Sequence, residues 1–224
     1  MGKKRTEEPP GPHYIVFDTE TTGFPSKRPG CPVRGIQFGF ALVSLKRGAV
    51  VETWSRMVRP GVWASSAPPA EEVHGLSRGV VEAHGVAPAK CWGEIEQILA
   101  VWAAVAGVGV GQVPMLAWNA PFDTQILHRL GVDAGVLAPS RLSPLPDARV
   151  PAVLHSGALS WADAPGGCLM RAYGQWARSL GLSSEQGLDA ARSTLGLLAR
   201  TGNHDAGTDA AMAGEVLLAM GRPR

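Results

Sequence analysis

Two acidic side chains near the end of an apolar run are the first candidates for chemistry. Asp18 ends the run Tyr14–Asp18, and Glu20 follows two positions later. In a β-strand this spacing puts both carboxylates on one face, where they repel each other unless a cation lies between them. Acidic residues in a threonine-rich segment also cap turns without any further function. The pair therefore indicates a cation site only if more carboxylates join it.

Three further candidates lie near the starts of expected helices. Asp123 falls in the first turn of a helix that follows a strand, and Asp209 lies near the start of the last helix. The helix dipole favours acidic residues at both places without a function. His204 precedes Asp209 by five residues in a polar loop, where a histidine is either a solvated side chain or a proton acceptor. A separate structural explanation would have to hold at each position, so the combination favours a carboxylate site served by a histidine.

The strands that would position these residues follow from alternation of apolar and polar side chains. Tyr14–Asp18 is typical of a buried first strand. The stretches Ile36–Val43 and Val50–Val58 alternate on either side of a turn at Lys46–Gly48, which predicts a hairpin. Val113–Trp118 is a further short apolar strand. We therefore expect three antiparallel strands at the start of the sheet and a later strand beside them.

Helical spacing predicts most of the remaining elements. Apolar residues recur in helical register between Ile95 and Val105, and again after Asn119, a candidate N-cap. Further elements are expected after residue 140: a short strand near Ala148–Leu154 and helices at Leu169–Leu180, Leu188–Leu198 and Thr208–Met220. The sequence thus predicts an α/β fold with a mixed five-stranded sheet, three antiparallel strands followed by parallel strands, flanked by helices.

Composition narrows the class of protein. With 224 residues, 45% of them hydrophobic, the chain is expected to form a single domain over residues 13–224, preceded by a charged, disordered leader at 1–12. The leader lacks the apolar stretch of a signal peptide, and the longest apolar run, Ile98–Gly111, is shorter than the roughly 20 residues that span a bilayer. Three widely spaced cysteines are expected to be free thiols. We therefore expect a cytoplasmic protein with no membrane partner.

Electrostatics alone does not identify a macromolecular partner. The formal net charge is only +2, so a nucleic-acid partner has to be argued from a site. Five basic residues are candidate phosphate contacts, although surface arginines are usually only solvated: Arg141, Arg149, Arg171, Arg178 and Arg192.

The combined motifs resemble the DEDDh exonucleases of the ribonuclease H-like superfamily. The matching segments are Asp18–Gly23, Asn119–Asp123 and His204–Asp209, and Val73–Ser77 resembles the histidine-glycine segment that this family carries between its first and second motifs. The order of the expected elements fits that fold. One departure is Trp118, which stands where the family usually has a histidine and would either pack beneath the site or stack on a base.

The resemblance implies a 3′-5′ exonuclease that removes nucleoside monophosphates from nucleic acid, first of all from single-stranded DNA, by two-metal-ion hydrolysis. It implies that Mg²⁺ or Mn²⁺ is held by four carboxylates, namely Asp18, Glu20, Asp123 and Asp209, and that His204 is the general base. It also places a set of residues against the terminal nucleotide: Thr19, Thr21, Thr22, Gly23, His74, Trp118, Asn119 and Phe122.

Several alternatives remain open at this point. The same site would serve trimming of RNA 3′ ends in the manner of ribonuclease T, because no feature of the sequence reads the 2′-hydroxyl. A non-catalytic nucleic-acid-binding module would keep the fold without the chemistry. A serine hydrolase is suggested by the elbow-like segment Gly75–Gly79, with Ser77 followed by Asp189 and His204, but no apolar strand precedes that serine.

The setting of the activity is less determined than its chemistry. The resemblance is closest to the epsilon proofreading subunits of bacterial DNA polymerase III and their stand-alone relatives. An epsilon subunit normally continues into a polymerase-binding tail, whereas this sequence ends at Arg224 shortly after the last expected helix. We therefore expect a stand-alone exonuclease or a detached domain, with a polymerase partner and the oligomeric state left open.

Overall fold

Four strands form a mixed sheet in the computed structural model, which describes residues 12–23, 33–63, 67–137 and 167–221. The strand order is β3 (Ala49–Met57), β2 (Gly35–Ser44), β1 (His13–Thr21) and β4 (Met115–Ala117). Neighbours among β1, β2 and β3 are antiparallel, and β4 is parallel to β1. The antiparallel start and the parallel neighbour are therefore confirmed.

The sheet has four strands among the described residues, one fewer than the five predicted. The strand expected near 148–154 lies outside the described residues. Beyond β4, a parallel bridge joins Ala117 to Cys168, which is too short to form a strand. Both β1 and β2 are internal strands: β2 lies between β3 and β1, and β1 pairs with β2 on one side and, over Ile15–Phe17, with β4 on the other.

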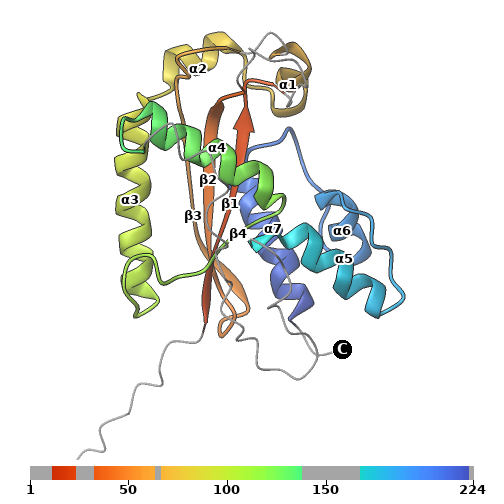
Figure 1. The fold of residues 1–224 in the computed structure, drawn as a ribbon. Coiled ribbons are helices and arrows are strands. Elements are labelled where there is room, and N and C mark those ends of the chain that lie inside the picture. Colours follow the sequence, from red (N-terminus) through yellow and green to blue (C-terminus); the bar gives the residue numbers. More distant parts are fainter. Residues whose placement is uncertain (1–11, 24–32, 64–66, 138–166, 222–224) are drawn as a thin grey trace, which may run out of the picture.

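Helices cover both faces of the sheet (Figure 1). On one side lie α3 (Pro88–Val105) and α4 (Ala120–Asp133), and on the other lie α5 (Leu169–Ser179), α6 (Leu188–Thr194) and α7 (Ala206–Met220). No helix within the described residues combines the length and the apolar character that a membrane span requires.

The alternation of β1 assigns its side chains to two hydrophobic cores. Ile15 and Phe17 pack in a core with residues of α3 and α4, whereas Tyr14 and Val16 pack in a second core with residues of α5, α6 and α7. Successive side chains of a strand point to opposite faces. At the end of β1, even-numbered residues therefore face α7 and odd-numbered residues face α4.

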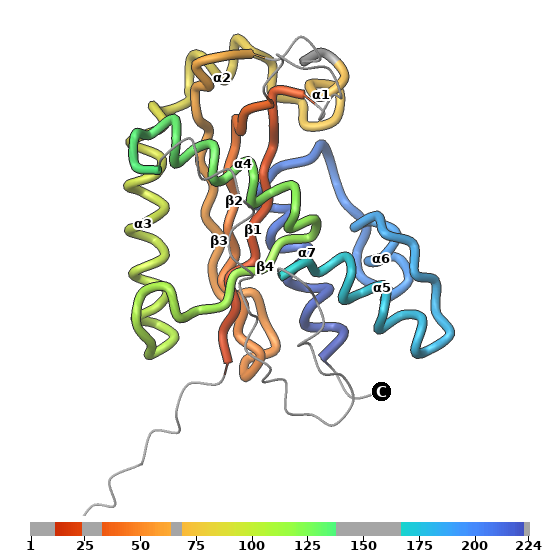
Figure 2. Tube along the Cα trace, in the orientation of Figure 1, coloured from red at the N-terminus to blue at the C-terminus, as the bar shows by residue number. Residues whose placement is uncertain are grey.

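Two short helices that the sequence did not predict cover the end of the sheet where β1 stops. They are α1 (Ala67–His74) and α2 (Arg78–His84), and they carry few buried apolar residues, which is why the sequence shows no clear apolar stripe there. The chain between α6 and α7 runs up to the same end before α7 turns back along the sheet (Figure 2). Loops, helix starts and the end of β1 thus converge in one place.

Candidate active site

The end of β1 presents polar groups to both faces of the sheet. Glu20 is on the face toward α7, and its side chain is buried although it is acidic. Thr19 is on the opposite face, where its Oγ1 donates a hydrogen bond to Asp123 Oδ1 over 2.8 Å. Asp123 lies in the first turn of α4 and is only 3% exposed. Asp18 lies between Phe17 and Thr19 in β1, and the charges of Asp123, Glu20 and Asp209 all act on it. It therefore connects Asp123 on one side of β1 with Glu20 and Asp209 on the other.

The start of α7 is docked onto β2 by a buried glutamine. Gln37 Nε2 donates to Asp205 Oδ2 over 2.6 Å, and Gln37 Oε1 accepts from the backbone N–H of Ala206 over 3.1 Å. Asp205 also caps the helix, because its Oδ1 accepts from Thr208 N over 2.9 Å. A side chain at Gly39 would place its Cβ 2.0 Å from the carbonyl carbon of Ala206. This close approach brings the first turn of α7, and Asp209 with it, against β1.

The sequence analysis missed Gln37 and Gly39, although both carry a signal. A polar side chain at a buried strand position needs a specific partner, and a glycine inside a strand commonly marks a close backbone approach. What the sequence does not reveal is that the same element, the start of α7, makes both contacts.

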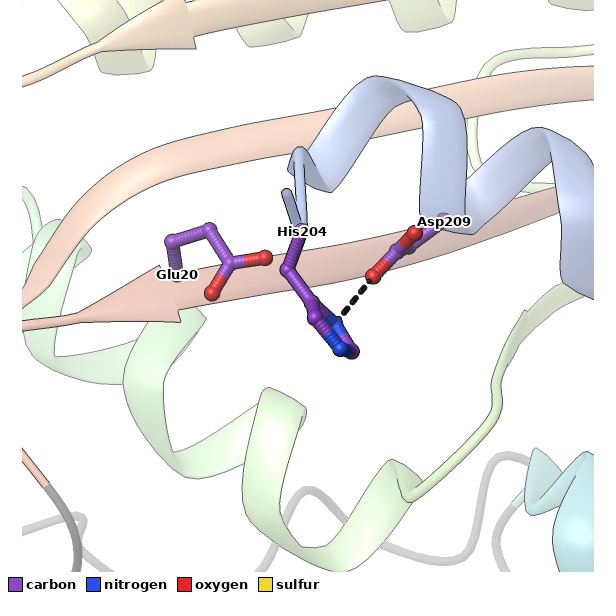
Figure 3. Close-up of side chains that lie close together, drawn as sticks. All are labelled: Glu20, His204 and Asp209. Atoms are coloured by element: carbon purple, nitrogen blue, oxygen red, sulfur yellow. Dashed lines mark hydrogen bonds and ion pairs between the residues drawn. The ribbon is translucent and has the colours of Figure 1, made fainter. Parts of the chain in front are cut away.

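Glu20, His204 and Asp209 form a cluster of possible ligands (Figure 3). One ligand atom from each residue lies within 4.8 Å of the others. His204 Nδ1 lies 2.8 Å from Asp209 Oδ2. Because a carboxylate oxygen accepts, this contact puts the imidazole proton on Nδ1 and leaves a lone pair on Nε2. His204 is partly exposed, so Nε2 is available to take a proton.

Burial and the nearby negative charges raise the pKa values of the carboxyl groups of β1. Burial raises the pKa of Glu20 to about 8, and the negative charges of Asp209 and Asp205 add to the effect. The pKa of Asp18 is raised well above its usual range, first by burial and then by the charges of Asp123, Glu20 and Asp209. The acidic residues are therefore close enough to oppose one another's ionisation.

The pKa of Asp123, on the other side of β1, is also raised. Burial raises its pKa to about 7, although the hydrogen bond from Thr19 and nearby backbone N–H groups lower it. Crowded carboxyl groups of this kind fit divalent cations, whose charge would favour the ionised forms. Oxygen ligands suit Mg²⁺ or Mn²⁺ best. The residues present thus fit the metal that the resemblance implied.

Arg200 is a further charged residue at this site, and the sequence analysis missed it. Its Nη1 donates to Asp209 Oδ1, and its Nε donates to Asp189 Oδ2 over 3.2 Å. The side chain is 9% exposed. A lone arginine in a polar stretch carries no sequence signal, because its partner Asp189 comes from α6, eleven residues earlier.

The last turn of α1 holds the loop that carries His204. The backbone N–H of Leu76 donates to His74 Nδ1 over 3.0 Å, so the imidazole proton is on Nε2, which lies 3.2 Å from the carbonyl oxygen of Thr21. Burial lowers the pKa of His74, in keeping with a neutral ring. The backbone N–H of His204 donates to the carbonyl oxygen of Val73 over 3.2 Å. The last two residues of α1 thus link β1, through His74, to the His204 loop, through Val73.

The other expected nucleotide contacts fall into two groups. Thr21, Thr22 and Gly23 are buried beside the site, where Thr21 Oγ1 donates to Gly23 O over 2.8 Å and Thr22 Oγ1 accepts from Arg34 N over 3.1 Å. These bonds shape the turn after β1. Phe122 is half-buried against the core shared with α3. Their contacts with a nucleotide stay predictions.

Trp118 and Asn119 precede α4. Trp118 is 8% exposed, its ring packs against Tyr173, and its Nε1 donates to the carbonyl oxygen of Gln186 over 2.9 Å. These contacts support the packing interpretation of Trp118. Asn119 occupies the expected N-cap position of α4, but its side chain makes no capping bond; its carbonyl oxygen accepts from Phe122 N instead.

The structure does not provide a serine hydrolase site. Ser77 caps α2 by accepting from Val80 N, and it follows α1 rather than a strand. A nucleophile elbow requires a strand directly before the serine. Asp189 and His204 have other partners, Arg200 and Asp209 respectively.

The arginines singled out from the sequence have different surroundings. Arg141 and Arg149 lie outside the described residues, and Arg171 and Arg178 are exposed on α5. Arg192 is buried; it pairs with Glu215 over 2.6 Å and donates to the carbonyl oxygen of Leu198. α6 ends at Thr194 and not at Leu198 as predicted, because Gly196 has a φ of +68° and the backbone N–H of Leu197 donates back to the carbonyl oxygen of Arg192.

No family model and no curated protein matches this sequence. Solved structures do match. The nuclease domain of 3′hExo, a DEDDh family member bound to rAMP, shares 14% identity at a TM-score of 0.62, and the match covers 92% of this chain and 90% of that chain. Cell-death related nuclease 4 shares 13% identity at a TM-score of 0.63, with 93% and 63% covered. Exonuclease I from E. coli, in complex with a dT13 oligonucleotide, shares 15% identity at a TM-score of 0.60, with 93% and 40% covered.

These likenesses establish the fold. The chain has the α/β architecture of these nucleases over nearly its whole length, and one of them belongs to the family that its motifs resemble. At such low identity the chemistry of this chain has to be argued from its own residues.

Proposed function

We propose that this chain is a metal-dependent 3′-5′ exonuclease of the DEDDh type. The observation that carries the proposal is the meeting of Asp18, Glu20, Asp123, His204 and Asp209 at the end of β1, in the fold of known exonucleases. A binding module without catalysis would gain nothing from crowding acidic groups whose pKa values are raised by burial, because that crowding destabilises the fold.

Glu20, Asp209 and Asp18 would hold one divalent cation, and Asp18 with Asp123 would hold the second. The chemistry that such cations supply at this site is a lower pKa for water and neutralised charge at the phosphate. Thr19 orients the carboxylate of Asp123 through its 2.8 Å hydrogen bond. The backbone of β1 fixes the spacing between Asp18 and Glu20, so the ligands need no rearrangement of the sheet.

His204 would act as the general base on the attacking water. Its Nδ1 is held by Asp209, so the free lone pair on Nε2 takes the proton. The ring is partly exposed on a loop, which lets it meet a substrate that approaches from solvent. The carbonyl oxygen of Val73 accepts from His204 N, and the neighbouring His74 ties the end of α1 to β1, so the loop is kept at the end of β1.

The substrate is the 3′ end of a single strand, with DNA as the first candidate and RNA trimming as the alternative. The solved neighbours include an exonuclease bound to a dT13 oligonucleotide and a 3′-exonuclease that recognises a histone mRNA stem-loop, so the fold accepts either sugar. We place this activity in the cytoplasm, since the described cysteines Cys91 and Cys168 are free thiols.

The experiment is a cleavage assay on 5′-labelled single-stranded DNA and RNA of matched sequence, with Mg²⁺ or with EDTA. It compares the wild type, Asp18→Ala and the control Glu185→Ala, which changes an exposed acidic residue in the segment between α5 and α6. We expect ladders that shorten from the 3′ end in Mg²⁺, lost by at least about a thousandfold in Asp18→Ala and unchanged in the control.

The preferred substrate would distinguish a DNA exonuclease from an RNA-trimming enzyme. Intact strands with folded wild-type protein in Mg²⁺ and in Mn²⁺ would contradict the proposal, and retained binding of the strands would then favour the non-catalytic module.

A further inference from the structure

Arg200 places a buried positive charge among the acidic groups of the candidate site. Its guanidinium extends from Asp189, in the first turn of α6, to Asp209, in the first turn of α7. Although burial lowers its pKa, the hydrogen bonds and charges of Asp209 and Asp189 raise it above the ordinary value. The charge also reaches β1, where it lowers the pKa of Asp18 and Glu20 against the effect of burial.

The guanidinium of Arg200 neutralises a carboxylate, Asp209, that is expected to bind a metal ion. Both carboxylate oxygens of Asp209 are engaged, Oδ1 by Arg200 and Oδ2 by His204. A divalent cation at the cluster of Glu20, His204 and Asp209 would need at least one of these oxygens. A guanidinium and a cation that share one carboxylate oxygen repel each other, so their occupancies are coupled.

The surroundings of Arg200 also permit its ion pair with Asp209 to break. Its Nη2 is buried without a hydrogen-bond partner among the described residues, so the guanidinium is incompletely satisfied where it lies. Its other partner, Asp189, is 54% exposed at the protein surface. Turning toward Asp189 would give the guanidinium both a full ion pair and water.

We propose that Arg200 is a resident counter-cation, which neutralises Asp209 in the metal-free protein and competes with a divalent cation for that carboxylate. This inference rests on the proposed function, because it assumes that the site binds metal. The competition acts on the side of β1 formed by Glu20 and Asp209. It does not act on Asp123, which lies on the other face and is bonded to Thr19.

The first test is a calorimetric titration of the metal-free protein with Mn²⁺, with free Mn²⁺ followed by electron paramagnetic resonance. It compares the wild type with Arg200→Gln, which removes the charge, and Arg200→Lys, which keeps it. We expect Arg200→Gln to tighten one binding step by about tenfold, since one like charge is removed from the site. The other step and the Arg200→Lys variant should stay within about threefold of the wild type.

The second readout is the melting temperature in EDTA and in excess Mn²⁺. Arg200→Gln should melt below the wild type in EDTA, where Asp209 has lost its counter-cation, and the deficit should shrink or reverse in Mn²⁺. If Arg200→Gln is unfolded in EDTA but folds with Mn²⁺, that result also supports the counter-cation role. A merely structural arginine predicts an equal deficit in both solutions, and that result, or unfolding in both, would overturn the inference.

The same measurements separate this inference from the proposed function. If the wild type binds Mn²⁺ and cleaves 3′ ends while Arg200→Gln binds Mn²⁺ no more tightly, the counter-cation role is wrong and the exonuclease stands. If the wild type neither binds Mn²⁺ nor cleaves, both are wrong.

Discussion

Glu20 is a buried carboxyl group whose nearest charges are mostly negative. Burial and the charges of Asp209 and Asp205 raise its pKa from 4.5 to about 8, so the folded protein holds a proton that the unfolded chain releases. A group with a raised folded-state pKa stabilises the fold below its unfolded value and loses that effect as the pH rises through its folded value. Asp18 and Asp123 have pKa shifts of the same sign.

The metal-free protein should therefore become less stable as the pH rises from about 4.5 to about 8. Glu20→Gln should remove part of this loss and raise the free energy of unfolding near the top of that range by up to a few kcal/mol. Urea denaturation in EDTA across the range would measure it. The exposed Glu185→Gln is the control, and a Glu20→Gln profile parallel to the wild type would show that the carboxyl group ionises freely in the fold.

Trp118 is a residue whose role depends on whether its ring is available. Because its Nε1 and its ring are both engaged inside the protein, Trp118→Leu, which removes the aromatic ring, should lower the free energy of unfolding by about 2–4 kcal/mol through lost packing and an unpaired carbonyl oxygen of Gln186. The KM for a single strand should change less than about twofold, whereas loss of a stacked base would cost about 1–3 kcal/mol of binding. Denaturation and steady-state kinetics on one preparation decide between these roles.

The end of α1 and the glycine that follows it lie against the His204 loop, since the backbone N–H of His204 donates to the carbonyl oxygen of Val73. Gly75 has a φ of +70°, and a Cβ there would lie 2.1 Å from Asn203 Nδ2, next to His204. Gly202 has a φ of +87° in the same loop as Asn203, but a Cβ there would meet nothing within 4 Å. The two glycines therefore separate backbone strain from displacement of the His204 loop.

Gly75→Ala should lower kcat by up to about tenfold, because the side-chain end of Asn203 has to move aside next to His204, and misplacing a catalytic group by about 1 Å costs up to a hundredfold. Gly202→Ala should share only the cost of the strained backbone, of order 1 kcal/mol in stability. Melting temperatures and kcat for both variants provide the test. Equal losses of kcat in the two would mean that contact with Asn203 does not position His204.

The whole molecule is organised around a site that draws on three elements. β1 lies between two cores, α4 belongs to one core and α7 to the other, and each supplies an acidic residue. A cation bound by all three would join the two layers of helices through the sheet. Metal binding should therefore stabilise the global fold and not only a loop.

Saturating Mg²⁺ should raise the melting temperature of the metal-free wild type. At a concentration 100 times its Kd, a ligand that binds only the folded state adds about 2.7 kcal/mol. Asp18→Asn should gain little, because Asp18 is shared by both expected cation positions. Differential scanning calorimetry with and without Mg²⁺ measures the gain; an equal gain in wild type and Asp18→Asn would place the metal elsewhere.

The sequence by itself determined the order of the sheet and the acidic residues of the site. Alternation in the hairpin and in β1 is a local property, so the strands and the face shared by Asp18 and Glu20 could be predicted from spacing. The starts of α4 and α7 likewise carry local signals. The helices α1 and α2 could not be predicted, because they depend on packing against the end of the sheet and not on an apolar stripe of their own.

Only the tertiary structure decided which polar groups meet at that end. Arg200 reaches Asp189 and Asp209, and Gln37 reaches Asp205, across up to 168 positions of sequence. Such pairings leave no periodic trace in a sequence, since hydrogen bonds between distant segments depend on how the helices pack on the sheet. For the same physical reason two roles of Trp118 were open from the sequence, and only its burial against Tyr173 favours one of them.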